Sequence, residues 1–151
     1  MWFKKKNLKP SFPIGDYALN MRLVESRSLR EFSEAEYEVT PRQFAGEGIY
    51  HAPDVDFIGR RWKINLGAVQ GSVYKIAPFL ECRSQNEAKE AAIRTLTFCN
   101  EQLGMPANQR TGLFVWDTTD GNVILQTAEA KDGFAVTLFL TAKSARDFQR
   151  V

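Results

Sequence analysis

The sequence predicts an α+β domain in which one long helix packs across a mainly antiparallel sheet of about five to six strands. Three observations lead to this prediction: a helix signal over residues 84–104, two strand-like runs before it, and three strand-like runs after it. An amphipathic helix has to cover its apolar stripe, and the flanking runs supply a sheet face that can do so. We therefore expect a β-hairpin, a helix and a three-stranded meander, in that order.

The predicted helix has a signal at each end. Ser84 is an N-cap candidate and Glu87 follows three residues later, which is the spacing of a capping box. Gly104 suits the left-handed residue that ends a helix, and Pro106 prevents the helix from resuming. At about 100° per residue the apolar side chains fall within one arc, and only Ile93 lies outside it. The stripe consists of Ala88, Ala91, Ala92, Leu96, Phe98, Cys99 and Leu103.

Two alternating runs precede the helix and form a predicted hairpin. Residues 57–66 alternate apolar with basic or polar side chains, which is the pattern of a strand with one buried face. Residues 67–71 turn the chain, and residues 72–82 run back alongside. Pro78 cannot donate a hydrogen bond to a neighbouring strand, so we expect it at a sheet edge or at a bulge.

Three more alternating runs follow the helix, at residues 111–117, 123–129 and 134–141. The pair Asp120-Gly121 separates the first two runs, and a second Asp-Gly pair separates the last two. Asp-Gly between alternating runs is a strong short-range signal for a hairpin turn. The three runs are therefore predicted to form a meander.

The two ends of the chain give weaker signals. Residues 17–24 alternate and are predicted as a strand, whereas residues 25–44 are compatible with a short helix or with extended chain. Residues 46–53 are expected to form a loop or a short edge segment. Residues 142–151 are expected to form a last helical turn.

Length and composition favour one globular domain. The chain has 151 residues, of which 44% are hydrophobic and 25% charged, and this is the ordinary mixture of a folded domain. We assign residues 11–151 to a single domain and residues 1–10 to a basic N-terminal arm. Lys4, Lys5 and Lys6 in this arm leave a weak contact with a membrane surface as an alternative role.

The charge balance argues against a nucleic-acid partner. The chain has 20 basic and 18 acidic residues, a net charge of +2, whereas nucleic-acid-binding domains usually carry a basic excess. No apolar run approaches the roughly 20 residues of a membrane-spanning helix, so no transmembrane segment is expected. Cys82 and Cys99 do not make a disulfide framework, and Cys99 belongs to the helix stripe. We therefore expect reduced thiols and a cytoplasmic location.

No motif for catalysis or for metal or cofactor binding stands out. The sequence has no phosphate-binding glycine loop, no HExxH and no paired CxxC. His51 is the only histidine, and with Asp54 or Asp56 it is a candidate for metal binding or proton transfer. Asp117 and Asp120 are a carboxylate pair that could do acid–base work, but both flank a predicted turn, where aspartate is common. Because metal sites usually need three or four protein ligands, we expect no metal, no cofactor and no catalytic residue.

Two features support a binding function. Arg61 and Lys63, with Arg60 nearby, are predicted on the solvent face of one strand, where cations suit an acidic partner. Trp62 and Trp116 are predicted on strands and are candidates for an aromatic face that binds a ligand. The candidate binding residues are Arg60, Arg61, Lys63, Trp62, Trp116 and His51.

The leading expectation for function is a non-catalytic protein-binding module of adaptor, chaperone or inhibitor type, with an unknown protein partner. It rests mainly on the missing catalytic motifs. A small-molecule-binding domain that uses an aromatic sheet face is the first alternative. An enzyme based on His51 with Asp54 or Asp56 is the second, and it has no support beyond these three residues.

Overall fold

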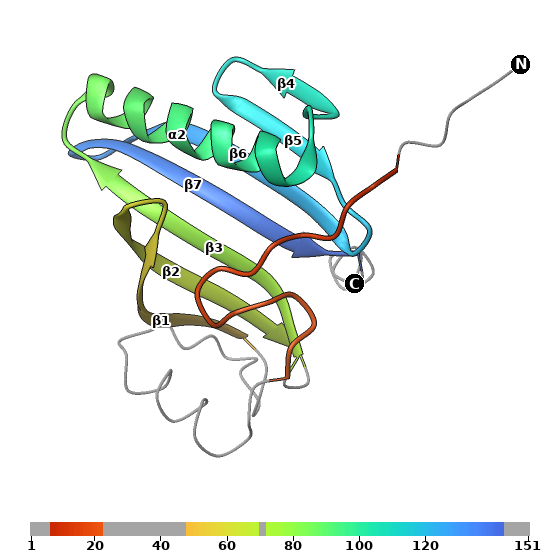
Figure 1. Ribbon diagram of the computed structural model, residues 1–151. Coiled ribbons are helices and arrows are strands. Elements are labelled where there is room, and N and C mark those ends of the chain that lie inside the picture. The colour runs from red at the N-terminus through yellow and green to blue at the C-terminus, as the bar shows by residue number, and fades with distance from the viewer. Residues whose placement is uncertain (1–6, 23–47, 70–71, 144–151) are drawn as a thin grey trace, which may run out of the picture.

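The computed structural model describes residues 7–22, 48–69 and 72–143. Figure 1 shows one sheet with the helix α2 (Gln85–Leu103) lying across one of its faces. The described sheet has seven strands, all antiparallel, in the order β1-β2-β3-β7-β6-β5-β4. The strands are β1 (Gly48–Phe57), β2 (Arg60–Val69), β3 (Ser72–Cys82), β4 (Asn108–Arg110), β5 (Leu113–Asp117), β6 (Gly121–Ala130) and β7 (Gly133–Ala142). The α+β class is confirmed, and the expected five to six strands are too few.

The predicted ends of α2 are confirmed. The Ser84 hydroxyl oxygen accepts a hydrogen bond from the Glu87 N–H at 3.1 Å and so caps the helix. The Glu87 carboxylate accepts from the N–H of Arg83 at 3.1 Å, one residue earlier than in a standard capping box. Gly104 ends the helix with a φ of 87°, and its N–H donates to the Asn100 carbonyl at 2.9 Å. Local sequence signals therefore determine both helix boundaries.

Small side chains let α2 lie close to the sheet. Its buried residues are Ala88, Ala91, Thr95 and Cys99. Thr95 does not belong to the predicted stripe, but its hydroxyl donates to the Ala91 carbonyl at 2.8 Å, so burial leaves no unpaired polar group. The other predicted stripe residues, Ala92, Leu96, Phe98 and Leu103, are partly buried. Ile93 is 59% exposed, in agreement with its place outside the stripe.

The pairing of β3 with β7 forms the centre of the sheet. Lys75 pairs with Thr141 and Leu80 with Val136, so the predicted hairpin and the predicted meander meet along this seam. Apolar side chains from the helix side of both strands belong to one core cluster with α2. Those that are fully buried include Ile76, Val136, Leu138 and Leu140.

The β2–β3 hairpin is confirmed, with different strand boundaries. Phe57 ends β1 rather than beginning β2, and Ile58 and Gly59 form the turn between these strands. Both turn residues have positive φ, 51° and 70°, as a tight two-residue hairpin requires. β1 lies at one edge of the described sheet. This agrees with the short edge segment expected within residues 46–53, but the strand runs on to Phe57 and is longer than expected.

Pro78 contradicts its predicted placement. It lies in β3, which is flanked by β2 and β7, and it pairs with Ile64 away from the irregularity between Gly67 and Ala68. It is therefore neither at an edge nor at that bulge. On the β7 side, pairing stops after Ile76 and resumes at residue 79. This gap in one ladder accommodates the missing N–H of proline within an interior strand.

The meander is confirmed, and one further strand extends it. β6 and β7 pair along their whole length, from Gly121 opposite Ala142 to Ala130 opposite Gly133. β4, with the sequence NQR, adds a short exposed edge beyond β5. These three polar residues show no alternation, so no sequence pattern predicts them as a strand.

The strand expected over residues 17–24 is wrong for its described part, residues 17–22. Gly15 and Asn20 have φ values of 57° and 67°, which bend the chain out of the extended conformation. The described segment forms isolated bridges, and one of them joins Arg22 to Ser72 at the start of β3.

Segment 7–22 helps to cover the same face of the sheet as α2 (Figure 1). Phe12, Ile14 and Leu19 are buried there. The ring of Phe12 meets that of Phe98 edge-on, with 4.9 Å between centroids. Segment 7–22 therefore contributes to the core as an irregular segment packed beside α2, and not as a strand of the sheet.

Several predictions lie outside the described residues. They are the basic arm with Lys4, Lys5 and Lys6, the alternatives for residues 25–44, and the last turn where it covers residues 144–151. Ala142 was expected to begin that helical turn. It is the last residue of β7, because the pairing of β6 with β7 continues to it.

The β5–β6 connection joins distant parts of the chain through Asp120. Its carboxylate accepts hydrogen bonds from the Ser11 N–H at 3.0 Å and from the hydroxyls of Ser11 and Thr118 at 2.8 Å each. Its carbonyl accepts from the Lys143 N–H at 2.9 Å. Burial alone would raise the pKa of Asp120, but these hydrogen bonds to the carboxylate outweigh burial and lower it.

Replacing Asp120 with asparagine is expected to lower the free energy of unfolding by about 1–2 kcal/mol at neutral pH, because a charged acceptor is lost. The pKa of Asp120 is lower in the folded state than the unfolded value of about 3.9. The stabilisation is therefore present above about pH 4 and is lost as the pH falls through the folded-state pKa. Urea unfolding at a series of pH values measures this, and the two proteins should converge in acid.

The control is Asp132→Asn at the other Asp-Gly turn, which should leave stability unchanged. A wild-type advantage over Asp120→Asn that persists undiminished to about pH 2 would contradict the assignment.

Candidate functional site

The two candidate tryptophans lie in the core, on the helix side of the sheet. Trp62 and Trp116 are each 1% exposed. The Nε1–H of Trp62 donates to the Phe57 carbonyl at 2.7 Å, and that of Trp116 donates to the Gly104 carbonyl at 3.0 Å. Both indoles connect structural elements within the core, and neither presents a surface to a ligand.

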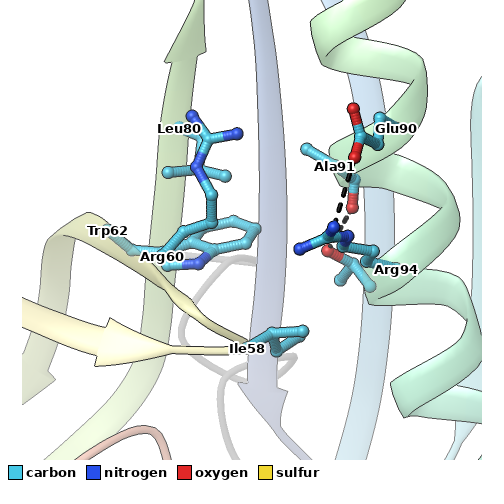
Figure 2. Close-up of a pocket in the computed structure, with 8 residues that line it drawn as sticks. Ile58, Arg60, Trp62, Leu80, Glu90, Ala91 and Arg94 are labelled. Carbon is cyan, nitrogen blue, oxygen red and sulfur yellow. Dashed lines mark hydrogen bonds and ion pairs between the residues drawn. The ribbon is translucent and has the colours of Figure 1, made fainter.

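Arg60 and Trp62 line a narrow slot between β2 and α2 (Figure 2). Its volume is about 30 Å³, which suits a bound water. Arg60 pairs with Glu87 at 3.0 Å, and across the slot Arg94 pairs with Glu90 at 3.2 Å. The hydrogen bond from Arg60 is the largest cause of the lowered pKa of Glu87. Because both guanidinium groups already have carboxylate partners, the slot does not favour an added anion.

Arg61 and Lys63 face the opposite side of the sheet from Arg60, so the three cations do not form one patch. Arg61 pairs with Asp56 at 3.2 Å, and Lys63 pairs with Glu81 at 3.4 Å. Both pairs are exposed, so each contributes less than about 1 kcal/mol to stability. They nevertheless neutralise the basic strand face, which weakens the case for an acidic partner there.

His51 is exposed on β1, and its Nδ1 forms a hydrogen bond with Oδ1 of Asn65 on β2. Across residues 7–22, 48–69 and 72–143, no group of three or more His, Cys, Asp or Glu side chains could hold a metal ion. The structure therefore does not gather His51, Asp54 and Asp56 into a metal-binding cluster.

Cys82 and Cys99 are both buried free thiols. Burial raises the pKa of Cys99 to about 12, and burial together with the Glu87 charge raises that of Cys82. We expect Ellman's reagent to leave both thiols unmodified in the folded protein and to modify both in guanidinium, because the reactive species is an accessible thiolate. Modification of either thiol in the native protein at the rate of free cysteine would contradict this.

One face of the sheet carries no helix among the described residues and has a hollow of about 370 Å³, which we call the helix-free hollow. This volume lies in the lower part of the range of about 300–1,000 Å³ for small-molecule sites. Strand alternation directs the side chains of five lining residues away from α2: Lys75, Asn122, Ile124, Phe139 and Thr141. Lys143, which follows the end of β7, also lines the hollow.

Strand register places the polar side chains of the hollow in one row. Lys75 on β3 pairs with Thr141 on β7, which in turn pairs with Asn122 on β6. Two residues further along β7 and β6, on the same face of the sheet, Phe139 and Ile124 pair with each other. Polar and apolar surfaces therefore lie side by side across three strands.

The described lining of the hollow includes two lysines and an asparagine whose acceptor atom is unsatisfied. Lys75 and Lys143 line it, and no carboxylate among the described residues does. The ammonium of Lys75 lies over the Phe139 ring, 4.9 Å from its centroid, and has no ion pair within the described residues. Oδ1 of Asn122 is buried and has no hydrogen-bond partner among the described residues. Such an atom costs about 1–3 kcal/mol, so its presence in a native fold calls for an explanation.

None of the residues that line the hollow is among the predicted site residues. They lie on several strands, and only the β3–β7 pairing brings Lys75 beside the residues of β7 and β6. The signal available in the sequence is the mixed outer face of the last strand, where Phe139 and Thr141 alternate with core residues.

Comparisons with protein families, with curated proteins and with solved structures found no match to this chain. Within the described residues, no helix has the length and apolar character to cross a membrane. Function is therefore inferred from the helix-free hollow and its chemistry.

Proposed function

We propose that this protein is a non-catalytic binding protein that takes up a small molecule in the helix-free hollow. The observation that carries the proposal is the hollow itself, which combines apolar surface with unpaired polar groups. Ile124 and Phe139 supply the apolar surface. Within the part of the chain that the structure describes, Lys75 supplies a cation without an ion pair, and Asn122 supplies an amide oxygen without a hydrogen bond. A mainly apolar concave site with a few placed polar groups is the usual form of a ligand site.

Binding is favoured over catalysis by what lines the hollow. As far as the structure describes the chain, the lining includes no histidine, carboxylate or thiol, and these are the side chains that most often transfer protons or attack substrates. Protein binding, the leading sequence-based expectation, stays a prediction. The ion pairs of Arg61 and Lys63 remove part of its motivation, because these cations already have acidic partners.

The test uses small probes that share one ring and differ in charge. Indole-3-acetate is anionic, tryptophol is neutral and tryptamine is cationic. Each is titrated into ¹⁵N-labelled protein, and amide shifts are followed by NMR. We expect at least one probe to give saturable shifts at Asn122, Ile124 and Thr141, which lie in the hollow.

Ile124→Trp should fill the hollow and abolish these shifts. Ala135→Trp is the matched control, because Ala135 lies on the same face of β7 but does not line the hollow. If no probe of any charge shifts residues of the hollow, or if Ile124→Trp leaves binding unchanged, the proposed function is wrong.

A further inference from the structure

The residues that line the helix-free hollow indicate the chemistry of its ligand. We infer that its ligand is a free small molecule with an apolar body, an anionic group and one N–H or O–H donor. This inference rests on the proposed function and deepens it. Each of the three parts follows from a different set of lining residues.

The anionic group follows from the cations. Lys75 and Lys143 line the hollow without a carboxylate among the lining residues, and neither has an ion pair in the described part of the chain. The nearby acidic residues are Asp117, which pairs with Asn122 but lines a separate hollow with Leu103, and Asp120, whose carbonyl accepts from the Lys143 N–H. The Asp120 carboxylate is already held by hydrogen bonds from Ser11 and Thr118. Among the described residues the lining therefore carries two cations and no anion, and this charge balance favours a negative ligand.

The donor follows from Asn122. Its buried Oδ1 accepts no hydrogen bond from the described residues, whereas buried polar atoms in native structures nearly always have a partner. A carboxylate alone has no hydrogen to offer, so it does not satisfy this oxygen. A ligand N–H or O–H does, after a rotation of the amide towards the hollow.

The apolar body follows from the row beside these groups. Phe139 and Ile124 pair across β7 and β6 and line the hollow together. Both side chains are partly exposed on a sheet face, where apolar surface gains from contact with a ligand ring. The ammonium of Lys75 at the Phe139 ring marks the junction of the charged and apolar parts.

The experiment compares probes by isothermal titration calorimetry. Indole-3-acetate should bind at least about tenfold more tightly than tryptophol, and tryptamine should bind most weakly. In 1-methylindole-3-acetate a methyl group replaces the hydrogen on the ring nitrogen and so removes the donor, which should weaken binding about fivefold. Inorganic phosphate at the same concentration should not compete, because it has no apolar body.

Variants assign each effect to a residue. Lys75→Met removes the charge and keeps most of the stem, so it should reduce the preference for the anionic probe over the neutral one about tenfold. Lys63→Met is the control, being a lysine of the same face outside the hollow. Asn122→Ala should make the affinities for indole-3-acetate and 1-methylindole-3-acetate equal. Asn65→Ala, the matched control, should preserve the difference between these two affinities. Asp117→Asn should tighten anion binding by about twofold.

The outcomes separate the inference from the proposed function. If tryptophol or tryptamine binds in the hollow as tightly as indole-3-acetate, the inference fails and the proposed function stands. If the two acetates bind equally to the wild type, the donor assigned to Asn122 fails. Absence of binding by every probe overturns the proposed function itself.

Discussion

Gly121→Ala is expected to destabilise the protein by about 3 kcal/mol or more, at the upper end of overpacking costs. A Cβ atom at Gly121 would lie 1.8 Å from the Thr141 carbonyl oxygen and 2.8 Å from its carbonyl carbon. Both atoms belong to the backbone of β7, so no side-chain rotation relieves the clash. The start of β6 would have to separate from the end of β7, where Gly121 pairs with Ala142. Guanidinium unfolding of the purified variant measures the loss.

Gly59→Ala is the matched control because its cost has a different origin. Gly59 has a φ of 70°, and a Cβ there meets no heavy atom within 4 Å. Its replacement should cost only the penalty for a left-handed conformation, about 1–2 kcal/mol. Gly121 does not have positive φ, so its requirement is steric. A Gly121→Ala protein at least as stable as Gly59→Ala would contradict the close approach of β6 to the β7 backbone.

Trp116→Ala is expected to cost about 3–5 kcal/mol, as large aromatic truncations in cores do. The indole is 1% exposed and lies between β5 and the end of α2. Its Nε1–H reaches both the Gly104 carbonyl, at 3.0 Å, and Oδ1 of Asn100, at 3.2 Å. Truncation would therefore leave a cavity and remove the donor that serves two acceptors at the helix end. Guanidinium unfolding measures this loss as well.

Trp116→Phe separates these two contributions. It keeps most of the apolar volume but removes the donor, so we expect a loss of about 1–2 kcal/mol. Hydrogen exchange should show the extra opening in the last turn of α2 rather than at its Ser84 end. Equal protection changes at both ends of the helix would show that the Trp116 hydrogen bonds do not hold the C-terminus.

The helix could be predicted to within a residue because its signals are local. Ser84 and Gly104 act on the backbone within a few positions of themselves, and both act as predicted. The Asp-Gly turns of the meander are local in the same sense. Thr95 was missed because a hydroxyl counts as polar in a sequence pattern, although the Ala91 carbonyl satisfies it inside the helix.

The edge strand β4, the conformation of residues 17–22 and the interior position of Pro78 could not be predicted, because each depends on partners distant in the sequence. β4 has three exposed polar residues and forms because β5 offers it an open edge. Residues 17–22 alternate like a strand, but positive φ at Asn20 and burial beside α2 give them another role. Pro78 is typical of an edge strand, yet the gap in the β3–β7 ladder accommodates it in an interior strand.

The candidate site was missed for the same reason. Trp62 and Trp116 were candidates as aromatic residues, but strand alternation places them under α2 rather than on the open face. Lys75 and Asn122 are ordinary strand residues when each is considered alone. They come together only when β7 lies between their strands, and no local pattern determines that order.

The position of β7 in the sheet has a consequence for synthesis of the chain. β3 is complete at Cys82, but the strand that covers its second edge spans Gly133–Ala142. During translation β3 leaves the ribosome long before β7 does. The backbone N–H and C=O groups on the β7 side of β3 therefore stay unpaired until β7 has been synthesised. A nascent chain stalled between α2 and β7 would therefore expose an unpaired strand edge, and a ribosome-associated chaperone should bind it at that stage and release it once β7 emerges.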